Sequence, residues 1–287
     1  MAFLDKFFSR KPSWEFNAGG VVWKLLCSKN ILLGDVRDTE KKHASFFALD
    51  FRNGEIFWKN VAVREQWWVG MQQALNDTLL LHGYEKPDMP LPKGIYALDV
   101  ATGELLWENN ELTFLFSCNG KSYAEQTGFL KKHFYEIDIR TGNILYDYGE
   151  NEEGIEQLRR LSSDDDIAEG SVFAEYIQHH DPVTRNVIEK HVDVARVRGG
   201  IDVAELNGLA VASYHEPARG AEAALNNIVT NKLIVIDIEN GNRLYEDILV
   251  RNAPAAIPDT FFIQDGILMY VKERERVTGV ALKDIRA

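Results

Sequence analysis

The sequence has only two cysteines, Cys27 and Cys118, and they stand far apart in the chain. No Cys-x-x-Cys pair occurs, so the sequence offers neither a thiolate zinc pair nor a redox dithiol. We expect both cysteines to be small buried hydrophobic side chains, with a disulfide between them as the alternative reading.

Basic residues are in deficit. The 32 lysines and arginines face 44 aspartates and glutamates, which gives a formal net charge of −12. Proteins that bind a nucleic-acid phosphate backbone usually have a net positive charge, so nucleic acid is not an expected partner. An acidic surface instead favours basic or neutral partners.

Long apolar runs are also missing. No stretch approaches the eighteen or more apolar residues of a membrane-spanning helix. The first sixteen residues, MAFLDKFFSRKPSWEF, lack the charged leader, apolar core and small-residue cleavage site of a secretory signal. We therefore expect a cytoplasmic protein.

Familiar catalytic motifs are absent as well. The chain contains no G-x-S-x-G, P-loop, G-x-G-x-x-G or H-E-x-x-H pattern. This favours a role that is not enzymatic and that needs no cofactor. Catalytic residues that come together only in the folded protein have no fixed spacing in the sequence, so the sequence also allows a catalytic role.

What the sequence does contain is an internal repeat. Four segments share a β-branched and aromatic run, an aspartate, a glycine four residues later and a second apolar run: FFALDFRNGEIFWKN (46–60), IYALDVATGELLWEN (95–109), FYEIDIRTGNILYDY (134–148) and LIVIDIENGNRLYED (233–247). The glycine supplies the positive φ that a tight turn needs, and the aspartate can bond turn amides. The pattern predicts four β-hairpins.

Two weaker copies extend the series. Residues 177–191 keep Asp181 and Thr184 but have Arg185 where glycine is expected, and residues 279–287 carry Asp284 after an apolar strand. Because two more apolar runs precede each strong hairpin, the repeat predicts an all-β chain of four-stranded antiparallel units. Six such units indicate a six-bladed β-propeller. The alternative is five blades, with the charged stretch 150–200 as an insertion.

The two ends of the predicted propeller match each other. The last repeat lacks its final strand, and SWEF (13–16) resembles the missing one. We expect this N-terminal strand to complete the last blade, which makes residues 13–287 a single β-propeller domain. Trp14, Trp58 and Trp107 recur at one repeat position, so we interpret them as packing residues.

The hairpin pattern, best seen in ALDVATGELLWEN, resembles the repeat of the quinoprotein-like (PQQ-like) propeller superfamily. That superfamily includes quinoprotein dehydrogenases and non-catalytic assembly scaffolds. The resemblance implies a propeller fold and points to a small cytoplasmic member. The dehydrogenases carry adjacent cysteines near the quinone, and this chain has none, so the resemblance does not transfer the cofactor.

In a propeller, the loops between second and third strands gather at the channel mouth, where function usually resides. The candidates for a binding face are the polar and aromatic residues of these loops together with an exposed tryptophan before an inner strand: Asp35, Arg37, Asp38, Trp68, His82, Tyr84, Glu85, His215, Glu216, Arg219 and Arg274. The alternative is that these are solvated hairpin ends. His82 and His215 are each followed closely by a glutamate, but they belong to different blades, so we expect no metal site.

The first residues form an amphipathic pattern. Phe3, Leu4, Phe7 and Phe8 share one face of a short helix over residues 1–12 that Pro12 ends. This helix is expected either to pack on the protein itself or to make peripheral membrane contact through residues 1–11.

Together these features predict a non-catalytic β-propeller scaffold or binding protein. It would act as a monomer and engage a protein or peptide on its channel-mouth face. The alternative is a hydrolase or lyase with an acid/base site in the central channel.

Overall fold

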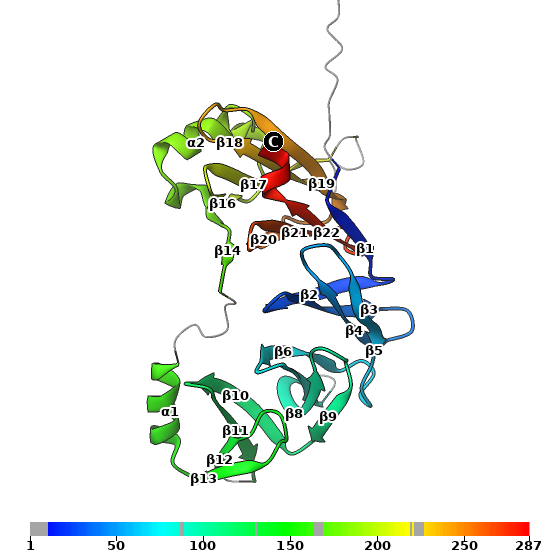
Figure 1. The fold of residues 1–287 in the computed structure, drawn as a ribbon, viewed down its shortest axis with the longest axis vertical. Helices are drawn as coiled ribbons and strands as arrows, with labels where there is room; N and C mark the ends of the chain where they lie inside the picture. The colour runs from blue at the N-terminus through cyan, green and yellow to red at the C-terminus, as the bar shows by residue number, and fades with distance from the viewer. Residues whose placement is uncertain are drawn as a thin grey trace, which may run out of the picture. The chain divides into compact units, whose positions relative to one another are not determined.

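The computed structural model describes residues 11–86, 89–129, 131–162, 169–218, 220 and 227–286, without the side chains of residues 86, 89 and 90. The helix predicted over residues 1–12 lies almost wholly outside this range. No helix within it is long and apolar enough to cross a membrane. The chain divides into two compact units (Figure 1). In the described part, unit 1 comprises 11–18, 52–54 and 170–286, and unit 2 comprises 19–51, 55–162 and 169.

Unit 2 contains three four-stranded antiparallel sheets, each with its strands in sequence order. The first sheet comprises β2 (Val21–Ser28), β3 (Ile31–Asp38), β4 (His43–Asp50) and β5 (Ile56–Val61). The second comprises β6 (Val69–Leu75), β7 (Thr78–Lys86), β8 (Met89–Asp99) and β9 (Leu105–Asn109). The third comprises β10 (Leu112–Cys118), β11 (Lys121–Thr127), β12 (Lys132–Ile137) and β13 (Ile144–Gly149). This meander is the architecture of a β-propeller blade.

Unit 1 contains two five-stranded sheets. The fourth sheet comprises β15 (Glu175–Tyr176), β16 (Ile201–Leu206), β17 (Leu209–Pro217), β18 (Val229–Asp237) and β19 (Arg243–Ala253). The fifth comprises β14 (Ser171–Phe173), β20 (Phe261–Gln264), β21 (Ile267–Lys272), β22 (Arg276–Ala281) and β1 (Trp14–Asn17). Strand β1 pairs with β22, Trp14 opposite Gly279, which confirms that the N-terminal strand completes the last sheet.

The four predicted hairpins are confirmed, and their turns form as the residues dictate. In the second sheet, Asp99 Oδ1 accepts hydrogen bonds from the amides of Ala101 (3.0 Å) and Thr102 (3.1 Å). Gly103 then adopts a φ of +75°, which a residue with a Cβ rarely does. Asp138 and Asp237 accept the same pair of amide hydrogen bonds. Gly54, Gly142 and Gly241 have a positive φ as well.

The recurring tryptophan joins one sheet to the next hairpin. The Trp58 indole donates to the carbonyl of Val100 (2.8 Å), and a Cβ built on Gly103 would lie 2.8 Å from the Trp58 ring. Trp107, in the second sheet, makes the same contact with the hairpin of the third sheet. Its indole donates to the carbonyl of Ile139 (2.9 Å), and a Cβ built on Gly142 would lie 2.7 Å from its ring. These tryptophans therefore have the packing role predicted for them.

The stretch 150–200 corrects the prediction of a hairpin over 177–191. It forms α1 (Glu152–Leu161), η1 (Ile177–His179), α2 (Pro182–Glu189) and η2 (Val194–Arg196) besides the short strands β14 and β15. Asp181 caps α2 by accepting from the amides of Val183 and Thr184, and Pro182 starts the helix. The described residues thus form five sheets rather than six.

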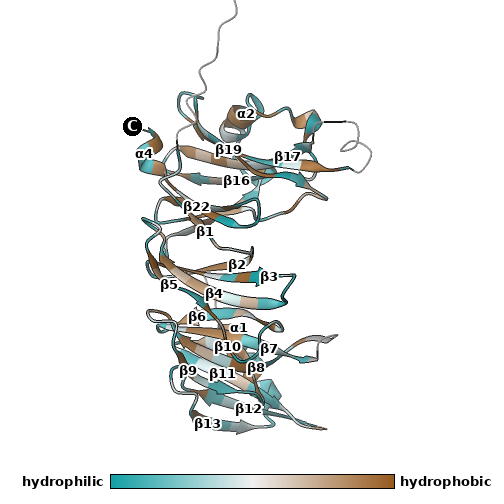
Figure 2. Ribbon diagram, turned by 90° about the vertical axis from the view of Figure 1, so that its right-hand side faces the viewer, coloured by the Kyte–Doolittle hydropathy of each residue, from teal (hydrophilic) through white to brown (hydrophobic). Residues whose placement is uncertain are grey.

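Helices α1 and α2 each pack on a sheet of their own unit. Ile155 and Leu158 of α1 pack with Phe134 and Cys118 of the third sheet, and Val187 and Ile188 of α2 pack on the fourth. Cys27 and Cys118 are both free thiols, so no disulfide joins them, and only Cys118 is buried. Elsewhere the sheets pack on one another through apolar strand centres that are brown in Figure 2.

Candidate functional site

Five of the residues predicted from the sequence come together in unit 2. Asp35 and Arg37 lie in the second half of β3, His82 and Tyr84 lie from the middle of β7 toward its end, and Trp68 directly precedes β6. The C-terminal halves of β3 and β7 lie on the same side of the unit, on the right in Figure 2. The repeat places these strand ends together because successive sheets run in the same sense.

Arg37 is the centre of this group. It is 8% exposed, and its Nη1 donates to the carbonyl of Trp67 (2.6 Å) while its Nη2 donates to the carbonyl of Val69 and to Asp35 Oδ2 (2.8 Å). Its guanidinium carbon also lies 5.6 Å from the centroid of the Trp67 ring. Arg37 therefore ties the first sheet to the segment that carries Trp67 and Trp68.

Asp35 is more deeply buried than its partner, with 1% of its surface exposed. Burial raises the pKa of the Asp35 carboxyl, although the charge and hydrogen bond of Arg37 act in the opposite direction. Within the described residues, Asp35 Oδ1 and Arg37 Nε are buried atoms that lack a hydrogen-bond partner. The pair is thus incompletely satisfied, and each member depends on the other.

His82 lies beside this pair. A Cβ built on Gly70 would approach both the imidazole (3.2 Å) and Arg37 Nη2 (3.7 Å), so the two side chains face one strand position. Burial, together with the positive charges of Lys24 and Arg37, lowers the pKa of His82 to about 4. His82 is therefore neutral near pH 7, and its buried Nδ1 lacks a partner among the described residues.

An aromatic ladder leads from His82 to the surface. The His82 and Tyr84 rings meet edge to face at 5.1 Å between centroids, and Tyr84 meets Trp68 in the same way at 6.2 Å. Trp68 is 40% exposed. Sequence reasoning missed Glu65, whose Oε1 accepts from the amides of Trp67 and Trp68, both at 2.9 Å.

The remaining candidates of unit 2 lie at its surface. Asp38 accepts from the amides of Glu40 and Lys41 and from the Lys41 ammonium (3.0 Å), which lowers the pKa of its carboxyl. Glu85 is exposed beyond Tyr84. Lys24 was not anticipated, and its ammonium reaches across to the carbonyl of Met71 (3.1 Å).

The candidates of unit 1 do not form a comparable group. His215 is buried and accepts from the amide of Ile257 (3.3 Å), and its burial lowers its pKa. Glu216 pairs with Lys232 at 2.7 Å. Arg274 is exposed in a turn with a φ of +63°, and Arg219 lies outside the described residues.

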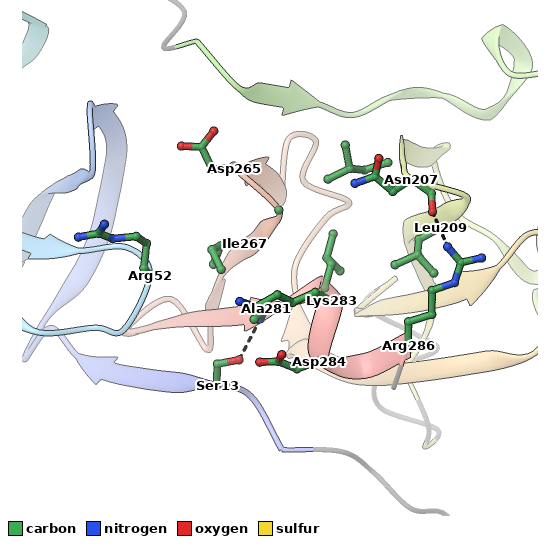
Figure 3. A pocket seen from close by; sticks show the side chains of 13 residues that line it. Ser13, Arg52, Asn207, Leu209, Asp265, Ile267, Ala281, Lys283, Asp284 and Arg286 are labelled. Carbon is green, nitrogen blue, oxygen red and sulfur yellow. Dashed lines mark hydrogen bonds between the residues drawn. The ribbon is translucent and has the colours of Figure 1, made fainter.

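Unit 1 has a pocket of about 690 Å³ at its opposite strand ends (Figure 3). The Asn207–Gly208 and Asp265–Gly266 turns and α4 (Leu282–Arg286) line it, and none of the binding-face candidates predicted from the sequence does. Arg286 donates to the carbonyl of Asn207 (2.7 Å) and pairs with Asp237 (3.2 Å). Its charge is thus already matched within the chain.

No group of three or more histidine, cysteine, aspartate or glutamate side chains suited to a metal ion occurs in the part of the chain that the structure describes. His82 and His215 fall in different units.

The comparisons with known proteins give one family and several solved structures. The model of a family described as Domain of unknown function (DUF4905) matches residues 27–107. That segment spans β3 to β8 and contains Asp35, Arg37, Trp68, His82 and Tyr84. The curated proteins gave no match.

The solved structures that are similar share little sequence with the chain. A europium-containing methanol dehydrogenase is 14% identical with a TM-score of 0.33, and the match covers 92% of this chain and 51% of that one. A member of the duf4221 family from Bacteroides vulgatus is 10% identical with a TM-score of 0.36, covering 95% and 96%. The β-propeller domain of Myceliophteria thermophila Cps50 (Swd1) is 9% identical with a TM-score of 0.35, covering 94% and 99%. The chain spans about half the length of the dehydrogenase.

Proposed function

We propose that this chain is a non-catalytic β-propeller binding protein that engages a polypeptide at the end of unit 2 where Trp68 is exposed beside the half-buried Tyr84. The observation that carries the proposal is an exposed tryptophan on a rigidly held segment. Glu65 fixes the amides of Trp67 and Trp68, and Arg37 fixes the carbonyls of Trp67 and Val69.

Rigid support matters because binding is weakened by every side chain and loop that must be ordered. Tryptophan and tyrosine contribute more than most residue types at protein interfaces, especially near the centre of the contact. Tyr84 braces Trp68 from the side. The net charge of −12 favours a basic or neutral partner, which is what this acidic chain attracts at long range.

The test starts from protein purified gently from its own host, with native mass spectrometry to identify a bound polypeptide. The affinity of that polypeptide is then measured calorimetrically for the wild type, Trp68→Ala and Trp23→Ala. Trp23 is the matched control because it is 65% exposed but lies inside β2 rather than before β6.

We expect Trp68→Ala to weaken binding by about thirtyfold, the effect of losing a hot-spot tryptophan, and Trp23→Ala to change it less than about threefold. Equal affinities for the wild type and Trp68→Ala would refute the proposed surface.

The neutral, half-buried His82 favours a second candidate, acid–base catalysis. An imidazole that stays unprotonated at pH 7, in the same group as a carboxyl whose pKa is raised by burial, gives the separated pKa values that an acid/base pair needs. A small-molecule adduct in the native mass spectrum, and an activity that His82→Gln removes while Trp68→Ala retains it, would support this candidate over the binding role.

A further inference from the structure

Two histidines fasten the two ends of α2 to the fourth sheet. His180 stands just before the helix and its N-cap, and His191 stands just beyond its end. The His191 ring reaches the carbonyl of Gly241, in the turn between β18 and β19. The His180 ring reaches Glu205 and Val203 of β16. All of these residues belong to unit 1, so the whole arrangement lies within one compact part of the chain.

Both ring nitrogens of His180 face acceptors. Nδ1 lies 2.6 Å from Glu205 Oε1, and Nε2 lies 3.0 Å from the carbonyl oxygen of Val203. A carbonyl and a carboxylate can only accept, so each ring nitrogen must carry a proton to form its bond. A neutral imidazole has a single N–H and can make only one of the two bonds. The geometry therefore requires the imidazolium form, which makes a charge-assisted hydrogen bond to Glu205.

His191 differs from His180 in the number of protons that its contact needs. Its Nε2 lies 2.8 Å from the carbonyl oxygen of Gly241, and the neutral tautomer with its proton on Nε2 is sufficient for this bond. His180 therefore loses a bond when its ring gives up a proton, whereas His191 keeps its bond in the neutral form. The two ends of α2 should respond differently to pH.

Two carboxylates lie near the His180 ring. Glu205 contacts the ring, and its side chain is 33% exposed, while the side chain of His180 is 13% exposed. Asp181 follows His180 and caps α2. Hydrogen bonds from the amides of Thr184 and Val183, together with the charge of His180, lower the pKa of Asp181. Because opposite charges stabilise each other, the imidazolium is supported both from β16 and from the start of α2.

The other titratable groups beside this contact face away from it. His179 pairs with Glu175 of β15, at 3.8 Å between Nδ1 and Oε2. Asp202 lies on the face of β16 that is turned away from α2, and burial, together with the charge of Asp259, raises the pKa of its carboxyl. The titrating groups of the contact are therefore His180 and its two carboxylates.

We propose that His180 is a pH-sensitive latch that holds the start of α2 on the fourth sheet. The doubly protonated ring joins the helix to both Glu205 and Val203, and loss of one proton breaks one of these bonds. Because the bonds form only in the folded chain, their stabilisation is present at low pH and is lost as pH rises through the range in which histidine titrates. Release of α2 would uncover Val187 and Ile188 and the apolar sheet face on which they pack.

The experiment is hydrogen exchange of the full chain, measured by mass spectrometry at pH 6 and pH 8.5 and corrected for the intrinsic exchange rate. We expect the protection of the α2 amides to fall about tenfold between these two pH values, the effect of losing one hydrogen bond to a charged group. The amides of α1, in unit 2, are the internal reference and should keep their protection. A wild type whose α2 protection is the same at both pH values would overturn the proposal.

Three histidine variants distinguish the latch from ordinary packing. His180→Gln should show the lower protection of α2 at both pH values, with no further fall at pH 8.5. His191→Gln should lower the protection at both pH values but retain the tenfold fall of the wild type, since His191 needs only one proton. His179→Gln is the matched control, because this neighbouring side chain is 63% exposed, and it should behave like the wild type. A fall in His180→Gln as large as that of the wild type would contradict the assignment.

Glu205→Gln tests the proton requirement without removing the ring. The glutamine amide can accept a bond from a protonated Nδ1 or donate one to an unprotonated Nδ1, so both bonds of His180 survive in the neutral form. The α2 protection of this variant should therefore change by less than about twofold between pH 6 and pH 8.5. If Glu205→Gln instead showed the full fall of the wild type, the two-proton contact of His180 would not be its cause.

Discussion

Replacing Arg37 by methionine tests how the candidate site is held together. Arg37 and Asp35 are 8% and 1% exposed, so the substitution leaves a buried carboxylate without its counter-charge. It also removes the donors to the carbonyls of Trp67 and Val69. Breaking one member of a buried ion pair costs about 3–5 kcal/mol, a large share of the 5–15 kcal/mol that keeps a typical domain folded.

The double variant Asp35→Asn/Arg37→Met separates the charge from the backbone bonds. It removes the stranded carboxylate but still lacks the two bonds to carbonyls, each worth about 1 kcal/mol, so we expect a loss of about 2 kcal/mol. Arg140→Met is the control, because Arg140 pairs with Asp99 at the surface and should lose less than about 1 kcal/mol.

The assay is urea unfolding at pH 7 and pH 4, followed by tryptophan fluorescence and near-ultraviolet circular dichroism. Burial raises the pKa of Asp35, so the stability associated with its neutral form is present at low pH and is lost as pH rises through that pKa. Arg37→Met should therefore be less destabilising at pH 4 than at pH 7. If Arg37→Met lost as little free energy of unfolding as Arg140→Met does, this reasoning would be refuted. A double variant less stable than Arg37→Met would refute it too.

Two further predictions concern His82 and the covered glycines. The pKa of His82 is lowered to about 4, so the unfolded chain binds a proton between pH 6.5 and 4 that the folded chain does not, and stability falls as pH drops through that window. With solvent screening, we expect a loss of about 2 kcal/mol between pH 7 and 4.5 in the wild type and little of it in His82→Gln; the same pH slope in both would contradict this assignment. Gly142→Ala and Gly120→Ala both place a Cβ at positive φ, but only the Cβ at residue 142 would lie under a ring, 2.7 Å from Trp107. Thermal unfolding should show Gly142→Ala to be about 1–3 kcal/mol less stable than Gly120→Ala, and equal stabilities would show that the tryptophan contact is unimportant.

The hairpins could be predicted from the sequence because their information is local. An aspartate, a glycine and flanking apolar runs suffice to form the turn, and the recurrence of Trp58 and Trp107 marks the packing position. The same local rule explains the wrong prediction at 177–191. Asp181 bonds the amides two and three residues ahead, as Asp99 does, and this contact serves a helix cap as well as a turn.

The helix cap forms instead of a hairpin turn because Pro182 favours the first turn of a helix and because Arg185 stands where the hairpins have a glycine.

The residues of the candidate site could likewise be predicted only in part. Strand ends could be placed from the repeat, which brought Arg37 and His82 together. Glu65 and Lys24 could not be found in this way, because they act through backbone groups that only the folded segment presents to them.

The pairing of β1 with β22 has a consequence for how the chain folds during synthesis. Trp14 and Phe16 are made long before their strand partner, around Gly279 and Val277. The sheets of unit 2 need only contacts between neighbouring segments and can form as the chain emerges. The fifth sheet must bring together segments from nearly opposite ends of the sequence, and closing so large a loop is slow. Until then β1 is an exposed apolar segment that molecular chaperones, which bind such segments, would be expected to protect.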